Sequence, residues 1–360
     1  MTDPVQCPGI RPCSEPVGGC ICAVARRYVF GVWTGRCAVQ TVGARVAVMS
    51  GRFGGAGMAA GERSGPEQQT LRKPAGLRGP GLFHGQIVKM RLLPAAAGTG
   101  IRFRRVDLAG APEVSASVEH VQPGARRTIL TSGAARVETT EHLLAALAGL
   151  RVDNCVVELD GPEVPAMDGS AMPFCEAILG AGLCGQGVSR RVLRIAELQR
   201  ISEPASGQWI ECIPSGSDDL VIDYRLDYGA ESPLPSQSWA IEVTPELFLR
   251  EIAAARTFVM AAEVEALQAA GFGRHLTRRE LVVFEADGSV QENSLRWSNE
   301  PVRHKVLDCI GDLALSGFSS TGRIVACRSG HKLNHVMARV LSTIVSTEAG
   351  HPVMSAGRAA

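Results

Sequence analysis

A histidine and an aspartate stand four residues apart, at His304 and Asp308, within residues 302–313. If this segment is helical, both side chains leave the helix from one face, as the metal ligands of H-E-x-x-H helices do. Asp312 lies one turn further along the same face, whereas Lys305 is displaced by about 100° around the axis. The spacing predicts two ligands for a divalent metal. It is also typical of a hydrogen-bonded His–Asp pair on a solvated surface.

A second candidate cluster lies where a helix is predicted to begin, over residues 140–150. Catalytic zinc usually has three protein ligands and one position for water, so His142 would complete a His₂Asp set with His304 and Asp308. Glu141 then becomes the candidate general base for that water. The alternative is that Glu141 only complements the positive end of the helix dipole.

Two further segments supply candidate acid and oxyanion groups. His331 follows Ser329-Gly330 at the predicted start of a helix over residues 330–345, where it would line a cleft and donate a proton. His335 stands four residues later, so His331 and His335 form a rival metal-binding pair. Thr257 has a hydroxyl that would donate to a developing oxyanion.

The elements that must position these residues follow from the spacing of apolar side chains. In a first group we predict strands at 86–93, 101–106 and 154–159 and helices at 140–150 and 171–183. In a second group we predict strands at 191–200, 209–213, 220–228 and 239–243, followed by helices at 245–255, 261–270, 301–315 and 330–345. Such an order indicates two α+β domains rather than a regular βαβα series. Residues 185–191, rich in glycine, are the predicted linker between them, and no phosphate loop or dinucleotide fingerprint is present.

Composition excludes several classes of function. The 360-residue chain has 37 Lys and Arg against 36 Asp and Glu, whereas a nucleic-acid-binding protein needs a basic excess. No stretch reaches the ~18 uncharged apolar residues of a membrane span, and no signal-peptide pattern is present. The 11 cysteines lack the spacing of a disulfide framework, which favours a reducing compartment. We therefore expect a cytoplasmic monomer with at most peripheral membrane contact.

Four regions are predicted along the chain. Residues 1–65 hold five of the 11 cysteines without a sustained period, and are interpreted as a disordered leader or a mis-assigned gene start. Residues 66–187 and 188–346 are the two predicted domains, the second with an insert at about 259–290. Residues 347–360 are a predicted flexible tail.

Five motifs occur in the order and with the spacing of one enzyme family. They are Thr139-Thr-Glu-His-Leu-Leu-Ala-Ala-Leu, Pro165-Ala-Met-Asp-Gly-Ser-Ala, Ala255-Arg-Thr-Phe, Val302-Arg-His-Lys-Val-Leu-Asp and Ser329-Gly-His-Lys-Leu-Asn. From about residue 69 to 345 the chain resembles the UDP-3-O-acyl-N-acetylglucosamine deacetylases, zinc enzymes that commit Gram-negative bacteria to lipid A synthesis.

The resemblance implies two similar domains, each a two-layer sandwich of β-α-α-β order, with the active site at their interface. It implies zinc, or alternatively Fe²⁺, as the cofactor and a UDP-linked, acylated N-acetylglucosamine as the substrate. The acetamide would be hydrolysed to acetate and UDP-3-O-(3-hydroxyacyl)-glucosamine. The implied site residues are the metal ligands His142, His304 and Asp308, the base Glu141, the oxyanion groups Lys305 and Thr257, and the acid His331 oriented by Asp312.

The chain departs from the family pattern at four places. The family's Gly-Leu-His-Thr-Gly loop has its histidine shifted to His84, Gln208 replaces a lysine, and His335 stands where asparagine is common. Residues 272–279 replace a Gly-Gly-Ser segment in the insert that shapes the acyl passage. Two other functions follow as alternatives: a zinc amidase for a different N-acyl sugar nucleotide, and a catalytically dead sugar-nucleotide-binding regulator.

Overall fold

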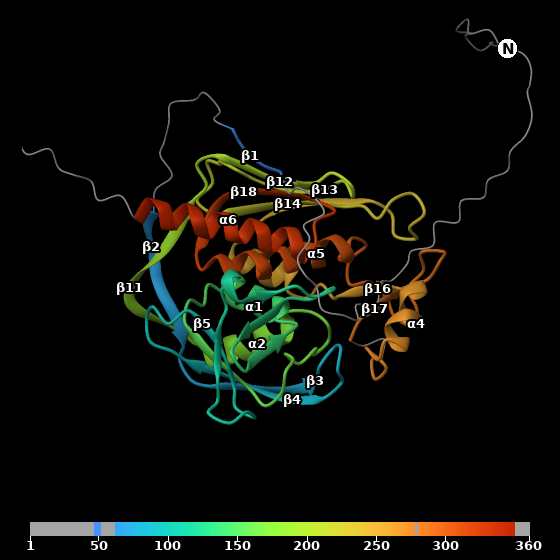
Figure 1. Cartoon of the computed structure of the whole chain (residues 1–360), viewed down its shortest axis with the longest axis horizontal. Coiled ribbons are helices and arrows are strands. Elements are labelled where there is room, and N and C mark those ends of the chain that lie inside the picture. The colour runs from blue at the N-terminus through green and yellow to red at the C-terminus, as the bar shows by residue number, and fades with distance from the viewer. Residues whose placement is uncertain (1–46, 52–61, 278–279, 350–360) are drawn as a thin grey trace, which may run out of the picture. The chain divides into compact units, whose positions relative to one another are not determined.

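The computed structural model describes residues 47–51, 62–277 and 280–349, all within one unit, Ala44–Ala360. Two main sheets with helices between them make up this unit (Figure 1). The structure is therefore mixed α+β, as the sequence predicts. The predicted leader and tail lie outside the described residues over 1–46, 52–61 and 350–360.

A five-stranded sheet is built from the first part of the described chain. Its order is β3 (Ala75–Pro80), β4 (Ile87–Pro94), β10 (Cys155–Leu159), β5 (Ile101–Arg105) and β6 (Glu113–Ser115). Along β4, Val88, Met90 and Leu92 are buried and the residues between them are exposed, because successive side chains of a strand point to opposite faces. A small sheet of β7 (Val121–Gln122), β8 (Ile129–Ser132) and β9 (Ala135–Glu138) follows the 3₁₀-helix η1 (Val118–His120).

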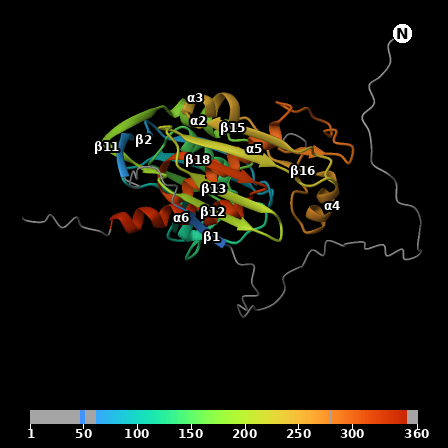
Figure 2. The same cartoon turned by 90° about the horizontal axis from the view of Figure 1, so that it is seen from above.

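An eight-stranded sheet forms the other main layer. Its path is β1 (Ala47–Gly51), β12 (Leu198–Glu203), β13 (Gln208–Ile213), β18 (Ser319–Cys327), β11 (Leu183–Arg194) and β2 (Glu62–Leu71), with β14 (Leu220–Leu226) also paired to β18 and β15 (Gln237–Glu242) paired to β14. Strand β18 is antiparallel to β13 and parallel to both β14 and β11. Seen from above, β12, β13 and β18 lie side by side over α6 (Figure 2).

Four helices fill the space between the two sheets. Helix α1 (Glu141–Gly149) packs against α2 (Met172–Ala181), which contacts β3 of the five-stranded sheet. Helix α5 (Glu300–Leu313) packs against α6 (His331–Ala349), and these two contact strands of the eight-stranded sheet. Helices α1 and α5 then pack on each other, so the motifs carrying the candidate metal ligands meet in the interior.

Helix α1 explains how polar side chains become buried at its start. Leu143, Leu144 and Leu147 are all buried, and Ala145 and Ala146 between them are too. A helix that is apolar on all sides belongs in a protein core. Its first residues, Glu141 and His142, are carried into the interior with it.

A further group of short elements follows β15 in the chain. A short helix α3 (Pro245–Leu247) runs into η2 (Phe248–Ile252), and then β16 (Phe258–Met260), α4 (Ala261–Ala269) and β17 (Val282–Phe284) complete the predicted insert region. Strands β16 and β17 pair in parallel and lie beside α4 (Figure 1). A final 3₁₀ turn, η3 (Ala314–Ser316), ends α5.

The structure corrects three expectations. The predicted linker 185–191 lies inside β11, which pairs with β2 and β18. Its glycines mark register shifts between Gly185 and Ser189, and Gly187 has a φ of 69°, so they form a bulge rather than a break. The predicted helix 245–255 has only a three-residue α-helical turn, since η2 has the wider hydrogen bonding of a π-helix. Finally, β1 and the start of β2 lie within the stretch 1–65.

Candidate metal centre and active site

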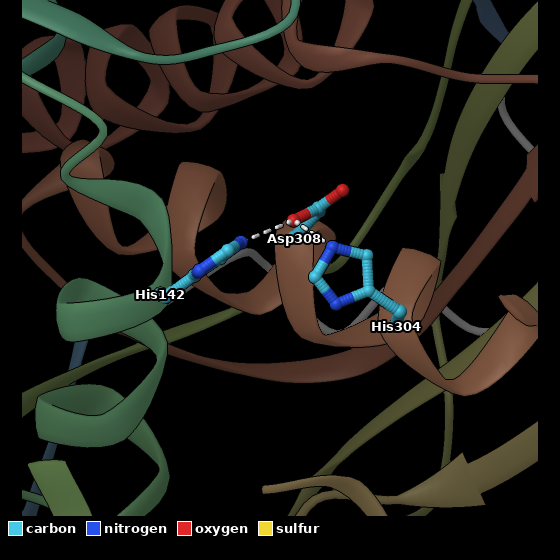
Figure 3. A group of neighbouring side chains, drawn as sticks. All are labelled: His142, His304 and Asp308. Carbon is cyan, nitrogen blue, oxygen red and sulfur yellow. Dashed lines mark ion pairs between the residues drawn. The ribbon is translucent and has the colours of Figure 1, made fainter. Parts of the chain in front are cut away.

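Two helices bring three candidate metal ligands together. His142 lies in the first turn of α1, and His304 and Asp308 lie one turn apart on α5 (Figure 3). Their ligand atoms are all within 4.8 Å of one another. Asp308 Oδ1 is 3.6 Å from His142 Nε2 and 3.3 Å from His304 Nε2, and all three side chains are buried.

The contacts of His304 fix its tautomer and its charge. His304 Nδ1 is 3.1 Å from the Ala255 carbonyl oxygen, which can only accept, so Nδ1 carries the proton. Burial, together with the neighbouring positive groups, lowers the pKa of His304 to about 4, against the opposing charge of Asp308. The imidazole is therefore neutral, and the lone pair on Nε2 faces Asp308 Oδ1.

Asp308 Oδ1 is itself a buried oxygen without a hydrogen-bond partner. An imidazole lone pair and a carboxylate oxygen aimed at each other in the interior leave a position that suits a cation. Two imidazole nitrogens and one carboxylate oxygen form the donor set that catalytic zinc sites use. The residues therefore fit a zinc ion.

Lys305 holds the second oxygen of Asp308. Its Nζ donates to Asp308 Oδ2 at 2.8 Å, and burial, which would lower the pKa of this amine, is outweighed by Asp308, so the pKa lies above the ordinary range. The ammonium thus leaves Oδ1 free to face the two histidines. Lys305 also lies over the Phe258 ring, 5.8 Å from its centroid.

Glu141, next to the candidate ligand His142 in the chain, is buried, and the backbone holds one of its carboxylate oxygens. Its Oε2 accepts from the Thr128 amide at 3.0 Å, and its Oε1 is 3.9 Å from His331 Nε2. Burial raises the pKa of Glu141, while the charges of His331 and His142 oppose that rise. A carboxylate with one oxygen fixed and the other free has the arrangement of a general base.

His331 begins α6 and points its two ring nitrogens at different carboxylates. Its Nδ1 is 2.8 Å from Asp312 Oδ2, so the other nitrogen faces Glu141. Burial would lower the pKa of His331, but the carboxylates of Asp312 and Glu141 overcome it and raise the pKa to about 10. His331 is consequently an imidazolium at neutral pH, with a proton to donate.

A cavity of about 720 Å³ opens onto these groups. Its lining includes Glu141, His142, His304, Asp308 and His331 together with Thr257 and Lys305. Apolar residues of the insert region continue the lining, among them Phe258, Leu267, Phe272 and Leu276. Seven of the eight sequence-predicted site residues therefore line one cavity, and the eighth, Asp312, lies behind His331.

The structure also has contacts to the site that the sequence patterns did not indicate. Thr128 binds both Glu141 and Asp312, and Asn334 Nδ2 donates to Asp312 Oδ2 at 2.9 Å. Asn334 belongs to a motif already singled out, whereas Thr128 precedes a short strand and has no local signature. His84 Nε2 lies 3.3 Å from Glu138 Oε2.

A mixed α+β fold with a buried His₂Asp group, an adjacent glutamate carboxylate and an imidazolium is typical of metal-dependent hydrolases. The chain matches the model of LpxC, the UDP-3-O-acyl N-acetylglycosamine deacetylases, over residues 68–343 and belongs to that family.

Curated relatives agree with this family. The chain is 40% identical over 274 residues to a UDP-3-O-acyl-N-acetylglucosamine deacetylase of Citrifermentans bemidjiense, covering 76% of this chain and 88% of the relative. It is 37% identical over 291 residues to one of Brucella melitensis, covering 80% of this chain and 99% of the relative. Among the described residues, no helix has the length and hydropathy to cross a membrane.

Proposed function

We propose that the protein removes the acetyl group of UDP-3-O-(3-hydroxyacyl)-N-acetylglucosamine, releasing acetate and UDP-3-O-(3-hydroxyacyl)-glucosamine. Family membership makes the chain a deacetylase of lipid A biosynthesis. The observation that carries the proposal is that a His₂Asp group, a buried glutamate carboxylate and an imidazolium line one cavity. The apolar lining from the insert region favours a substrate with an acyl chain.

His142, His304 and Asp308 would hold zinc. Zinc supplies a Lewis acid, which makes water a nucleophile near neutral pH and polarises the acetyl carbonyl. Lys305 keeps Asp308 ionised and oriented through the 2.8 Å contact to Oδ2. The Ala255 carbonyl oxygen accepts the proton on His304 Nδ1 and so fixes the tautomer that leaves Nε2 free for the metal.

Glu141 takes the proton of the attacking water at its free oxygen, Oε1. The Thr128 amide holds Oε2 at 3.0 Å, so the carboxylate cannot rotate as the proton arrives. Burial of Glu141 favours its protonated form, which makes the carboxylate a stronger base than one in water.

Thr257 and Lys305 line the cavity and are the proposed donors to the oxyanion of the tetrahedral intermediate. Thr257 is fixed by its backbone, because its amide donates to the Gly169 carbonyl at 2.8 Å and its carbonyl accepts from Val282 at 2.9 Å. His331 then gives the proton on Nε2 to the departing sugar amine, and Asp312 keeps the ring in place through Nδ1.

The finer description of the fold is also a proposal. The two helix pairs, α1 with α2 and α5 with α6, each cover one main sheet, which favours two similar sandwiches of β-α-α-β order within 66–187 and 188–346. The active site would then lie at their interface, since His142 comes from one and His304 from the other. The six cysteines of the described residues are free, which favours a cytoplasmic location. Size-exclusion chromatography tests the expected monomer.

Two variants separate the roles of base and ligand. Glu141→Ala should retain zinc but lose most acetate release, whereas His304→Ala should lose zinc as well. His120→Ala, outside the cavity, is the matched control and should keep both. Normal zinc content and normal turnover in both site variants would contradict the assignment.

Metal removal tests the proposed cofactor directly. Acetate release should stop after complete chelation and return when zinc is added, while Fe²⁺ added instead tests the alternative metal. Full activity of the metal-free protein would overturn the mechanism. Comparing acylated with unacylated UDP-N-acetylglucosamine distinguishes the proposed substrate from other N-acyl sugar nucleotides.

A further inference from the structure

Asp312 is a fully buried carboxylate whose two oxygens are shared among four donors. Oδ2 accepts from His331 Nδ1 at 2.8 Å and from Asn334 Nδ2 at 2.9 Å. Oδ1 accepts from Thr128 Oγ1 at 2.6 Å and lies 3.2 Å from His335 Nε2.

The proton inventory of this cluster fixes the tautomer of His335. The single hydroxyl proton of Thr128 goes to Asp312 Oδ1, because an ionised carboxylate can only accept. At 2.9 Å from His335 Nε2, Thr128 Oγ1 must therefore accept. His335 Nε2 consequently carries a proton, which points between Thr128 Oγ1 and Asp312 Oδ1.

His335 is also placed against the proposed acid itself. It stands one helical turn after His331 on α6, and the two rings are stacked with centroids 6.1 Å apart and planes inclined by 27°. Each ring has only a small exposed fraction, 12% for the side chain of His331 and 13% for that of His335. Both imidazoles thus donate to opposite oxygens of one carboxylate in a setting with little water to screen them.

We propose that His335 is a positioning residue for His331: by donating toward Thr128 and Asp312 Oδ1, it fixes the Asp312 carboxylate and limits how firmly that carboxylate holds the proton on His331. A carboxylate that accepts more hydrogen bonds shares its negative charge more widely, and so attracts each proton less. Consistent with this, burial opposes ionisation of Asp312, yet the charges and hydrogen bonds of His331 and His335 keep its pKa below the ordinary value.

Other charged groups around α6 are engaged elsewhere. On α1, Glu141 faces His331, and on α5, Asp308 acts on His331 from further away. On the strands beneath α6, Arg200 pairs with Glu211 and Glu203 pairs with Lys332. On η1, Glu119 is exposed and His120 is partly buried. Within the described part of the chain, none of these groups forms a hydrogen bond or an ion pair with Asp312.

Two substitutions of similar size test the proposal. The amide nitrogen of glutamine reaches the position of Nε2 in histidine, whereas that of asparagine reaches only the position of Nδ1. His335→Gln should therefore keep the donor to Thr128 and Asp312, and His335→Asn should lose it. We expect the zinc-loaded His335→Asn protein to have its alkaline limb of kcat/KM raised by roughly one pH unit and kcat lowered several-fold at neutral pH, with KM unchanged. His335→Gln should have the same alkaline limb, kcat and KM as the protein without a substitution.

The inference rests on the proposed role of His331 as the acid, so a readout independent of turnover is needed. Histidine NMR on the zinc-loaded protein should show His331 titrating at higher pH in His335→Asn and at its original pH in His335→Gln. Identical titrations of His331 in all three proteins would overturn the inference, as would equal effects of the two substitutions. If no acetate were released by the unchanged protein, the proposed function would fail, while the NMR comparison would still decide the role of His335.

Discussion

Gly311 lies where α5 comes close to the backbone of α1. A Cβ atom at this position would lie 2.1 Å from the Glu141 carbonyl oxygen and 3.2 Å from the Ala145 amide nitrogen, whereas ordinary contact begins at 3.4 Å. Both neighbours are backbone atoms of α1, so no side chain can turn away. The substitution Gly311→Ala therefore requires the two helices to separate by about 1 Å at this contact.

That separation acts on stability and on the metal site together. Overpacking of this kind costs about 1–3 kcal/mol of the free energy of unfolding. The candidate ligand His142 lies on α1, and His304 and Asp308 lie on α5, so these three side chains should move apart by a similar distance. Since ligand distances in metal sites vary by only about 0.2 Å, we expect zinc affinity to fall by at least 10–100-fold.

Zinc affinity is measured by competition with a chromophoric chelator, and the free energy of unfolding by urea denaturation. Gly180→Ala is the matched control, because Gly180 lies in α2 with open space around its Cβ position. That change should leave zinc affinity unaltered and raise stability by about 0.5–1 kcal/mol. Unchanged zinc affinity and stability in Gly311→Ala would refute the reasoning, since α1 and α5 would then not be in the close contact described.

Two more variants test charges within the fold. Asp312→Asn should move the alkaline limb of acetate release to lower pH, because the proposed acid, His331, must be protonated to act and its pKa of about 10 depends on this carboxylate. An unmoved limb would count against that role. Likewise, the stability that comes from the raised pKa of His331 is fully present below pH 6.5 and is lost as the pH rises to about 10, whereas the part that comes from the lowered pKa of Asp312 is lost as the pH falls below 3.8. Glu300→Ala should lower the free energy of unfolding, measured by urea denaturation, by about 3–5 kcal/mol, because the buried guanidinium of Arg256 would lose its carboxylate partner. A loss below about 1 kcal/mol would contradict this.

Local spacing was sufficient to predict that two of the candidate ligands lie on one face of a helix. His304 and Asp308 occupy α5 four residues apart, and the apolar run of α1 placed Glu141 and His142 at a helix start. Both inferences depend only on the 3.6-residue period, which sequence displays directly. The motif around His331 likewise begins α6, although spacing alone left His331 and His335 as a rival pair of ligands.

Contacts between distant segments were not predictable in the same way. Thr128 meets Asp312 across 184 residues, and no periodicity near Thr128 indicates that partner. The glycines of residues 185–191 have the composition of a linker, but pairing with β2 and β18 makes this segment a strand. Composition describes the local preference of a segment, whereas the neighbouring strands decide its final conformation.

The division of the candidate ligands between α1 and α5 has a kinetic consequence. Neither helix alone offers three donors, so tight zinc binding must wait until the two helices have docked, an event that closes a long chain segment and is correspondingly slow. An ion bound across that contact must also be released, or carried with one helix, before the helices can part. Zinc should therefore lengthen the lifetime of the folded protein by slowing unfolding, with little influence on the rate of folding.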